Sequence, residues 1–211
     1  TYDPDRRVVL ILDEWGTWYE VEPGHNEGHL YQQNTMRDAM VAAVSLNIFH
    51  KQTGRLKMCN IAQVVNVLQS MILTDGPRMV LTPTYHIFKM YGVHKNATYV
   101  PVSYRPGSII SASGKAMENL SVSASRDKKD VLHISLANPY LDKPMDVELK
   151  FEELKPRSVS GEILQAPGID AFNDFGKAAA VAPASFRDAK ISGKKITLTL
   201  PAASVVVLEV K

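Results

Sequence analysis

Residues 8–15 have the sequence VVLILDEW, in which an unbroken apolar run is followed at once by two carboxylates. A short apolar run rich in β-branched residues is typical of a strand buried on both faces, as in a parallel sheet. Asp13 and Glu14 therefore fall at the C-terminal end of the expected strand, where α/β barrels place their catalytic groups. Because side chains alternate along a strand, we expect Glu14 to share a face with Leu12 and Leu10, and Asp13 to face the other way.

A helix and a second strand are expected to follow this first strand. Asn34 or Thr35 can cap a helix whose apolar residues recur at i, i+3, i+4 and i+7 as far as Ile48, and Gly54 ends it. Residues 56–62 then have the pattern of a second buried strand. Parallel neighbours need a crossover connection, so the sequence predicts a strand, helix, strand repeat.

The sequence changes character about halfway along the chain. Before this point, Thr82 with Pro83 predicts the start of a further helix, which Gly92 ends. After it, apolar and polar residues alternate in short runs, as in antiparallel sheets. These runs cover residues 120–125, 131–137, 145–151, 195–200 and 204–210. The predicted fold class is therefore α/β plus all-β, with an α/β domain of residues 1–96 followed by a β-sandwich of residues 97–211.

Composition excludes several kinds of partner. The chain has 211 residues and a formal net charge of +2, and no basic patch favours a nucleic-acid partner. Its longest apolar runs fall far short of the roughly 18 residues needed to span a bilayer. We therefore expect a soluble protein without a membrane partner, whether cytoplasmic or exported.

Metal ligands are sparse in the sequence. The single cysteine, Cys59, excludes an intrachain disulfide framework and a multi-cysteine metal site, and inside an apolar strand it is expected to be a buried small hydrophobe. His25 and His29 are four residues apart, but the proline and glycines around them make a poor helix. No metal site is expected.

Aromatic and amide side chains after the two strands are candidates for ligand contacts. The loop of residues 15–33 is long for a simple connection, and its Trp15 and Trp18 rings could pack on sugar rings or hold the loop down by their own contacts. Gln63 directly follows the second strand, where its amide could bond sugar hydroxyls or cap the strand end. Glu14 itself could be a catalytic carboxylate or a solvated acid at a strand end.

Four segments in the first half carry a resemblance to a known family. They are Leu12-Asp-Glu-Trp-Gly-Thr-Trp-Tyr, Asp38-Ala-Met-Val-Ala-Ala, Asn60-Ile-Ala-Gln-Val-Val-Asn and Thr82-Pro-Thr-Tyr-His-Ile-Phe-Lys-Met-Tyr. In order and spacing they resemble the family 51 glycoside hydrolases, chiefly α-L-arabinofuranosidases. The second half resembles the same family through Asn138-Pro, Leu164-Gln-Ala-Pro-Gly-Ile-Asp-Ala-Phe-Asn-Asp-Phe and Leu200-Pro-Ala-Ala-Ser-Val-Val-Val-Leu.

The resemblance implies that the chain is the C-terminal part of such an enzyme: the last two βα units of a (β/α)8 barrel, followed by an antiparallel β-sandwich. It implies that Glu14 is the nucleophile of a retaining mechanism, that Gln63 contacts the sugar, and that Trp15 and Trp18 lie at or near the sugar site. It implies no metal or organic cofactor. The family's general acid/base glutamate belongs to an Asn-Glu pair that would precede Thr1, so we expect a piece of a longer protein that is inactive alone.

The function expected of the full-length enzyme is hydrolysis of terminal non-reducing α-L-arabinofuranosides in an arabinofuranosyl-containing oligo- or polysaccharide. Asn26-Glu27 has the letters of the missing pair, but it lies in the loop after the first strand and is not expected to replace it. Two alternatives stay open: a non-catalytic carbohydrate-binding or structural β-sandwich module, and another retaining specificity of the same family, endoglucanase or xylosidase. Open apolar strand edges predict self-association of this chain, or partial disorder of about its first 30 residues with the β-sandwich as the stable part, and a homo-oligomer is expected.

Overall fold

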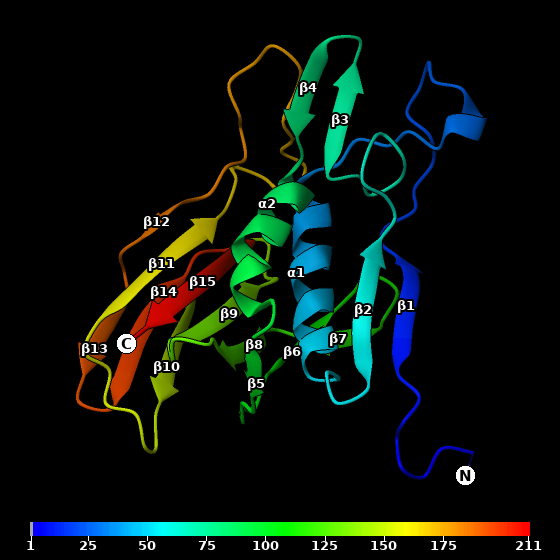
Figure 1. Ribbon diagram of the computed structural model, residues 1–211. Coiled ribbons are helices and arrows are strands. Elements are labelled where there is room, and N and C mark those ends of the chain that lie inside the picture. The colour runs from blue at the N-terminus through cyan, green and yellow to red at the C-terminus, as the bar shows by residue number, and fades with distance from the viewer. Residues whose placement is uncertain (1) are drawn as a thin grey trace.

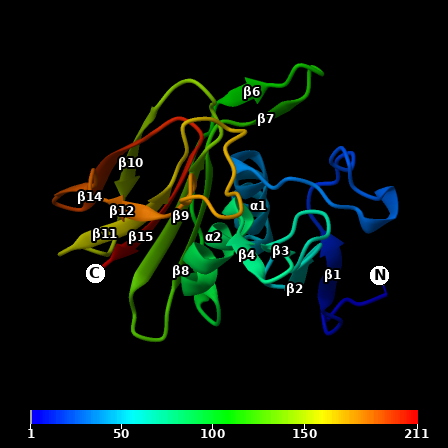
Figure 2. The ribbon, with the colours of Figure 1, turned by 90° about the horizontal axis from the view of Figure 1, so that it is seen from above.

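A computed structural model describes residues 2–211, whose elements lie in layers (Figure 1). The first half contains β1 (Leu10–Trp15), α1 (Met36–His50), β2 (Leu56–Ile61) and α2 (Pro83–Met90). Strands β1 and β2 lie at one side, the two helices lie in the middle, and a large antiparallel sheet lies on the far side of the helices. Figure 2 shows the same order from above.

The predicted strand, helix, strand repeat is present. β1 and β2 are parallel neighbours, with Leu10 opposite Leu56, and α1 is the crossover between them. The helix starts with a capping box in which the Asp38 carboxylate accepts a hydrogen bond from the Thr35 backbone N–H at 2.8 Å. Its buried residues pack toward the large sheet rather than toward solvent.

A hairpin precedes α2 that the hydrophobic pattern does not indicate. It consists of β3 (Ile72–Asp75) and β4 (Arg78–Leu81). The turn between them depends on Gly76, whose φ of +56° is a conformation that glycine adopts without steric cost. Helix α2 then begins as predicted, with Thr82 as its N-cap and Pro83 in the first turn, and runs into the short helix η2 (Tyr91–His94).

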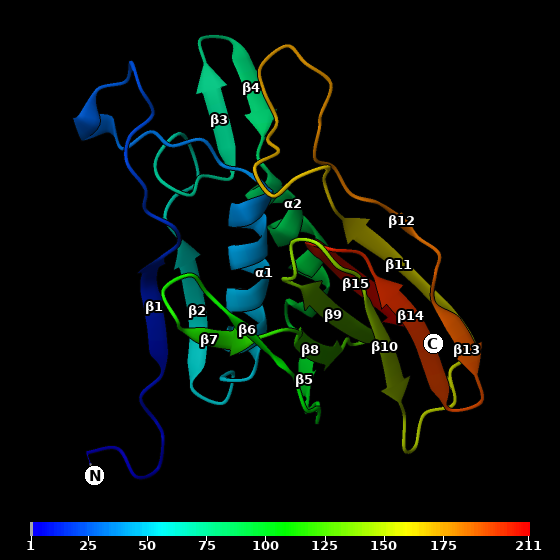
Figure 3. The same cartoon turned by 180° about the vertical axis from the view of Figure 1, so that it is seen from behind.

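The second half consists of antiparallel sheets (Figure 3). One sheet contains, in spatial order, β12 (Ala184–Phe186), β11 (Val159–Leu164), β15 (Ser204–Val210), β9 (Leu132–Asn138), β8 (Ser121–Arg126) and β5 (Thr98–Val100). A second sheet contains β10 (Met145–Lys150), β14 (Lys195–Leu200) and β13 (Lys190–Ser192), and a separate hairpin contains β6 (Ser108–Ile110) and β7 (Ala116–Glu118).

The six-stranded sheet is covered on both faces. On β15, Val205 and Val207 belong to the hydrophobic cluster that contains α1 and α2. Val206 and Leu208 belong to a second cluster, shared with the three-stranded sheet through residues such as Leu198. Burial on both faces explains why this last strand is almost continuously apolar.

The helix-facing side of β8 and β9 is polar rather than apolar. The His94 ring, 8% exposed, contacts the Ser125 hydroxyl at 2.7 Å and also the Ser135 hydroxyl. The His50 ring of α1 contacts the Ser123 hydroxyl at 2.9 Å. Burial lowers the pKa of His94 to about 3 and that of His50 to about 4, so both rings are neutral in the folded protein at pH 7.

Residues 165–183 form neither helix nor strand but join the two halves of the chain. The carbonyl oxygens of Ala171 and Ile169 accept hydrogen bonds from the first N–H groups of α1, at 2.9 and 2.7 Å. The buried Asn173 amide donates to the carbonyl oxygen of Leu81 at 2.9 Å. This segment thereby fixes the N-terminal end of α1 and the end of β4 to the all-β half.

Two expectations about the strands are wrong. β1 and β2 are not buried on both faces, since most of their residues are exposed. Cys59 of β2 is half-buried rather than buried, because helices cover only one face of the two-stranded sheet, and partial burial raises the pKa of its thiol. No helix among residues 2–211 is both long and apolar enough to cross a membrane.

Candidate functional site

Glu14 lies at the C-terminal end of β1, and its side chain is exposed. The register between the strands shifts there. Leu12 pairs with Cys59 and Trp15 with Ile61, so β1 has one residue more than β2 between these two pairs, which makes a bulge. Such a bulge redirects side chains. The common face expected for Leu12 and Glu14 is therefore not realised: Leu12 is half-buried, whereas Glu14 is open to solvent.

Trp15, the next residue, anchors the strand end to the helices. Its ring packs edge-on against Phe49 of α1, with centroids 5.1 Å apart, and stacks against Phe88 of α2 at 6.1 Å. Gly16 follows with a φ of +145°, and a Cβ there would lie 3.2 Å from the Gln69 amide oxygen. Glycine lets the chain turn closely over Gln69. From the sequence, Trp15 is expected either to pack on a sugar ring or to hold the loop by its own contacts. Its packing against Phe49 and Phe88 corresponds to the second expectation.

Gln63 lies at the same edge as Glu14. The Ala62 N–H donates to the Trp15 carbonyl oxygen at 2.9 Å, so the two strand ends stay paired up to the residue before Gln63. The side chain of Gln63 is exposed, and its backbone N–H donates to the carbonyl oxygen of Val67 at 3.1 Å. The fold thus brings together, at one edge of the parallel pair, the strand ends that carry Glu14 and Gln63.

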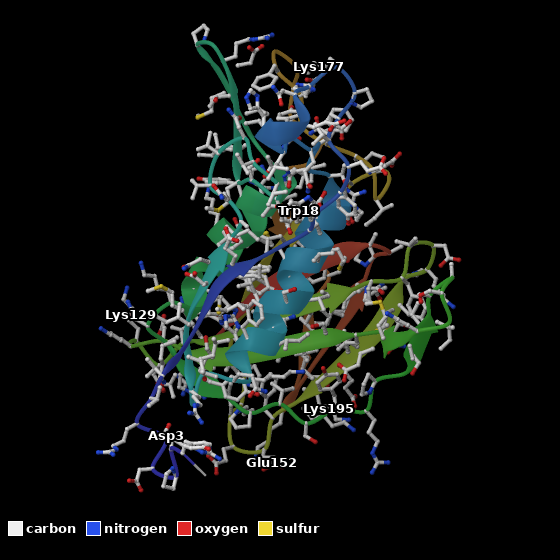
Figure 4. All side chains as sticks on the ribbon, turned by 90° about the vertical axis from the view of Figure 1, so that its right-hand side faces the viewer. Asp3, Trp18, Lys129, Glu152, Lys177 and Lys195 are labelled. Atoms are coloured by element: carbon white, nitrogen blue, oxygen red, sulfur yellow. The ribbon has the colours of Figure 1, made fainter. Side chains whose placement is uncertain are left out.

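Trp18 is the most open aromatic ring of the loop after β1, with 68% of its surface exposed. Figure 4 views the molecule from the β1 side and shows Trp18 where the strand passes into the loop above it. Beside it, the Tyr19 ring lies 3.7 Å below the Arg37 guanidinium of α1. The loop is therefore held against the helix while the Trp18 indole stays accessible.

A groove opens between the loop after β1, the segment after Gln63 and the β3–β4 hairpin. Its walls include His25, Tyr31, Asn66, Thr74 and Phe175. The His25 and Tyr31 rings stack with centroids 4.2 Å apart, and Asn66 and Thr74 exchange two hydrogen bonds. Flat rings next to amide and hydroxyl groups are surfaces on which saccharides bind. Within residues 2–211, no three His, Cys, Asp or Glu side chains are arranged to hold a metal ion.

Three buried polar residues behind Trp18 are absent from the candidates predicted from the sequence. They are Gln32, Asp38 and Gln69, with exposed fractions of 2%, 0% and 0%. Asp38 has a local signal, since an acidic residue three positions after Thr35 fits a capping box. The two glutamines have none, because an amide that bonds distant backbone groups leaves no spacing pattern in the sequence.

Comparison with known proteins decides the family. Residues 13–204 match the family described as the α-L-arabinofuranosidase C-terminal domain. The chain belongs to this family. The chain is 48% identical over 210 residues to an intracellular exo-α-L-arabinofuranosidase of Bacteroides ovatus, a match that covers 100% of the chain and 41% of the relative. It is 27% identical over 180 residues to a probable α-L-arabinofuranosidase C of Aspergillus clavatus, covering 81% of the chain and 35% of that relative.

Solved structures agree with this membership. The chain matches the crystal structure of the GH51 arabinofuranosidase from Xanthomonas axonopodis pv. citri with a TM-score of 0.96 and 42% identity, over 100% of the chain and 42% of that protein. An α-L-arabinofuranosidase from Thermotoga maritima matches with a TM-score of 0.79 and 22% identity, over 97% of the chain and 43% of that protein. At this identity the match supports the fold alone. The predicted family resemblance is confirmed, and the chain spans about two fifths of these relatives' length.

Proposed function

We propose that this chain is part of a retaining α-L-arabinofuranosidase in which Glu14 is the catalytic nucleophile. The observation that carries the proposal is the exposed Glu14 carboxylate at the C-terminal end of a parallel strand, in a chain of the α-L-arabinofuranosidase C-terminal domain family. Catalytic groups of α/β barrels lie at such strand ends. The exposed amide of Gln63, at the end of the neighbouring strand, supports a site on this edge.

In this proposal residues 1–96 are the last two βα units of a (β/α)8 barrel, and residues 97–211 are a β-sandwich. A parallel pair with helices on one face only supports this division, because the other face of β1 and β2 is left open and apolar. Ile11 and Met58, which are partners on the two strands, expose 55% and 52% of their surfaces. The barrel strands of the full-length enzyme would cover this face and pair with the open edges.

The mechanism needs two carboxyl groups about 5 to 5.5 Å apart. A Glu14 oxygen attacks the anomeric carbon of the arabinofuranosyl unit as the bond to the leaving oxygen breaks, and a glutamic acid outside this chain protonates that oxygen. Water, deprotonated by the same outside glutamate, then attacks the anomeric carbon and releases Glu14. No metal or organic cofactor takes part.

The remaining site residues bind and orient the sugar. Gln63 would bond sugar hydroxyls, and the open indole of Trp18 would pack on the sugar ring. Trp15, wedged between Phe49 and Phe88, would act on the site through the strand end that it anchors. The groove beside Gln63 would take further residues of an arabinofuranosyl-containing oligo- or polysaccharide, and the full-length enzyme would act as a homo-oligomer.

Glu14→Gln in the full-length enzyme tests the proposal with nitrophenyl α-L-arabinofuranoside as substrate. We expect kcat to fall by several orders of magnitude with folding intact, because the amide keeps the shape of the side chain but cannot form the covalent intermediate. Glu20→Gln, in the exposed loop nearby, is the matched control and should retain wild-type activity. A Glu14→Gln enzyme with more than a tenth of wild-type activity would remove Glu14 from the role.

A panel of nitrophenyl glycosides separates this function from its rivals. Turnover of the arabinofuranoside, and not of the glucoside or xyloside, is expected. Preference for one of the other sugars would reassign the specificity within the family. Glycan binding without turnover of any member would favour the non-catalytic module.

A further inference from the structure

Trp18 is exposed, yet both of its chain neighbours are hydrogen-bonded to side chains that are almost completely buried. The Thr17 N–H donates to the Gln69 amide oxygen at 2.8 Å, and the Thr17 hydroxyl donates to the Asp38 carboxylate at 2.6 Å. On the other side of Trp18, the Tyr19 N–H donates to the Gln32 amide oxygen at 3.0 Å.

The amide nitrogens of the two glutamines complete the network. Gln32 Nε2 donates to the Thr17 hydroxyl at 3.1 Å, so a single side chain holds the residues before and after Trp18. Gln69 Nε2 donates to the Asp38 carbonyl oxygen of α1 at 2.7 Å and to the Thr84 hydroxyl of α2 at 3.2 Å. Gln69 thereby connects the loop to both helices by hydrogen bonds.

Burying a carboxylate and two amides is costly unless their hydrogen bonds are made. Apolar side chains could hold a loop against two helices at lower cost, but they would not fix its backbone direction. Hydrogen bonds from three buried groups to the residues flanking Trp18 fix that direction, because each bond has a narrow range of distance and angle. The network therefore fixes the position of the backbone on both sides of Trp18, in addition to contributing stability.

We infer that Thr17, Gln32, Asp38 and Gln69 form a clamp that positions the Trp18 indole over the sugar attacked by Glu14. The inference rests on the proposed function. These four are positioning residues: they act on the sugar through Trp18 and lie behind it, buried or half-buried. A displacement of about 1 Å in a substrate-positioning group can lower the rate about 100-fold, so the clamp contributes to turnover as well as to affinity.

The test compares Thr17→Val with Thr17→Ser in the full-length enzyme, using nitrophenyl α-L-arabinofuranoside. Valine keeps the shape of threonine but lacks the hydroxyl, whereas serine keeps the hydroxyl that bonds Asp38 and Gln32. We expect Thr17→Val to lower kcat/KM about tenfold or more, and Thr17→Ser to stay within about threefold of the wild type. Thr82→Val is the matched control, because the Thr82 hydroxyl is also buried and bonded, to the Ser70 carbonyl oxygen at 2.8 Å. It should lower the melting temperature without changing kcat/KM.

A double-mutant cycle with Trp18→Ala shows whether the clamp acts through Trp18. Two residues that act as one unit give non-additive effects, so Thr17→Val should change kcat/KM by less than twofold once Trp18 is already alanine. Additive losses, or a Thr17→Val enzyme as active as the wild type, would overturn the inference. If Thr17→Val does not accumulate as folded protein, Gln32→Glu takes its place, since it keeps the acceptor for Tyr19 but cannot donate to Thr17. A wild-type enzyme without arabinofuranosidase activity would instead overturn the proposed function, and the clamp's role with it.

Discussion

At the residue scale, the parallel pairing of two short strands places Glu14 and Gln63 at the same edge. Gln63→Ala in the full-length enzyme should lower kcat/KM about fivefold, because one neutral hydrogen bond to a sugar hydroxyl contributes on the order of 1 kcal/mol. Steady-state kinetics with an arabinofuranoside measures the change. Gln52→Ala, an exposed glutamine at the opposite end of β2, is the control and should leave the rate unchanged. Unaltered kinetics for Gln63→Ala would return Gln63 to a structural role at the strand end.

The residues of the site differ in how far the sequence predicts them. Glu14 and Gln63 could be located because, in each case, polar residues follow an apolar run, and this change marks the end of a strand. The direction of Glu14 could not, because the bulge between Leu12 and Trp15 interrupts the alternation on which that prediction depends. Trp15 and Trp18 are the same residue type three positions apart, and only the packing of Trp15, the last residue of β1, against Phe49 distinguishes an anchoring ring from an exposed one.

At the element scale, the contact of η2 and α1 with the six-stranded sheet depends on neutral histidines. The pKa of His94 is lowered to about 3 and that of His50 to about 4, both by burial, whereas an unfolded chain titrates near pH 6.5. Between these values the unfolded chain binds protons that the folded chain does not. The free energy of unfolding should therefore be highest above about pH 6.5 and fall with acidification, by about 1.4 kcal/mol per pH unit for each histidine, until the folded pKa is reached.

Thermal unfolding of the full-length enzyme at a series of pH values measures this dependence. His94→Gln should lower the melting temperature at pH 7 but flatten its decline between about pH 6 and 4, because one of the two titrating groups is gone. His25→Gln, an exposed histidine, is the control and should keep the wild-type slope. An unchanged slope in His94→Gln would show that His94 is not the group that titrates.

Elements with a strong period could be predicted, and those without one could not. α1 has apolar residues at helical spacing and a capping residue, and β8, β9, β10, β14 and β15 have alternating or continuous apolar runs, so both kinds lie within a residue or two of their predicted bounds. The β3–β4 hairpin has only four residues in each strand. β11 contains Gly161 in its interior, where Leu208 and the Val207 backbone approach too closely for a side chain. That close approach comes from the pairing of β11 with β15, a contact between distant segments that the local sequence does not encode.

At the scale of the whole molecule, the chain has one face that its own residues do not cover. Ile11 of β1 and Met58, its partner on β2, expose 55% and 52% of their surfaces, and the outer edges of the parallel pair are open. We expect the isolated 211-residue chain to self-associate and to lack hydrolytic activity, because exposed apolar edges recruit partners and the proposed mechanism draws its second carboxylate from outside residues 1–211. Light scattering and an arabinofuranosidase assay on the same sample test both parts.

A charged variant locates the associating face. Val9→Lys with Ile11→Lys should reduce the scattering mass of the isolated chain, whereas Leu141→Lys, which is 66% exposed in the all-β half, should not. Association that Leu141→Lys also abolishes would move the associating face away from β1. A monodisperse wild-type monomer that hydrolyses arabinofuranosides would contradict the missing-carboxylate account and require a second carboxylate in the loop after β1.

The most direct test of the account is to identify the carboxylate that carries the sugar. The full-length enzyme would be mixed with an activated aryl α-L-arabinofuranoside, quenched in acid during the first turnover and digested with trypsin for mass spectrometry. The account predicts that the peptide of residues 8–37 gains the mass of one arabinofuranosyl group and that fragmentation locates this group on Glu14. A sugar found on Asp13, on Glu20 or on a peptide outside this chain, or turnover with inversion and no labelled peptide, would contradict it.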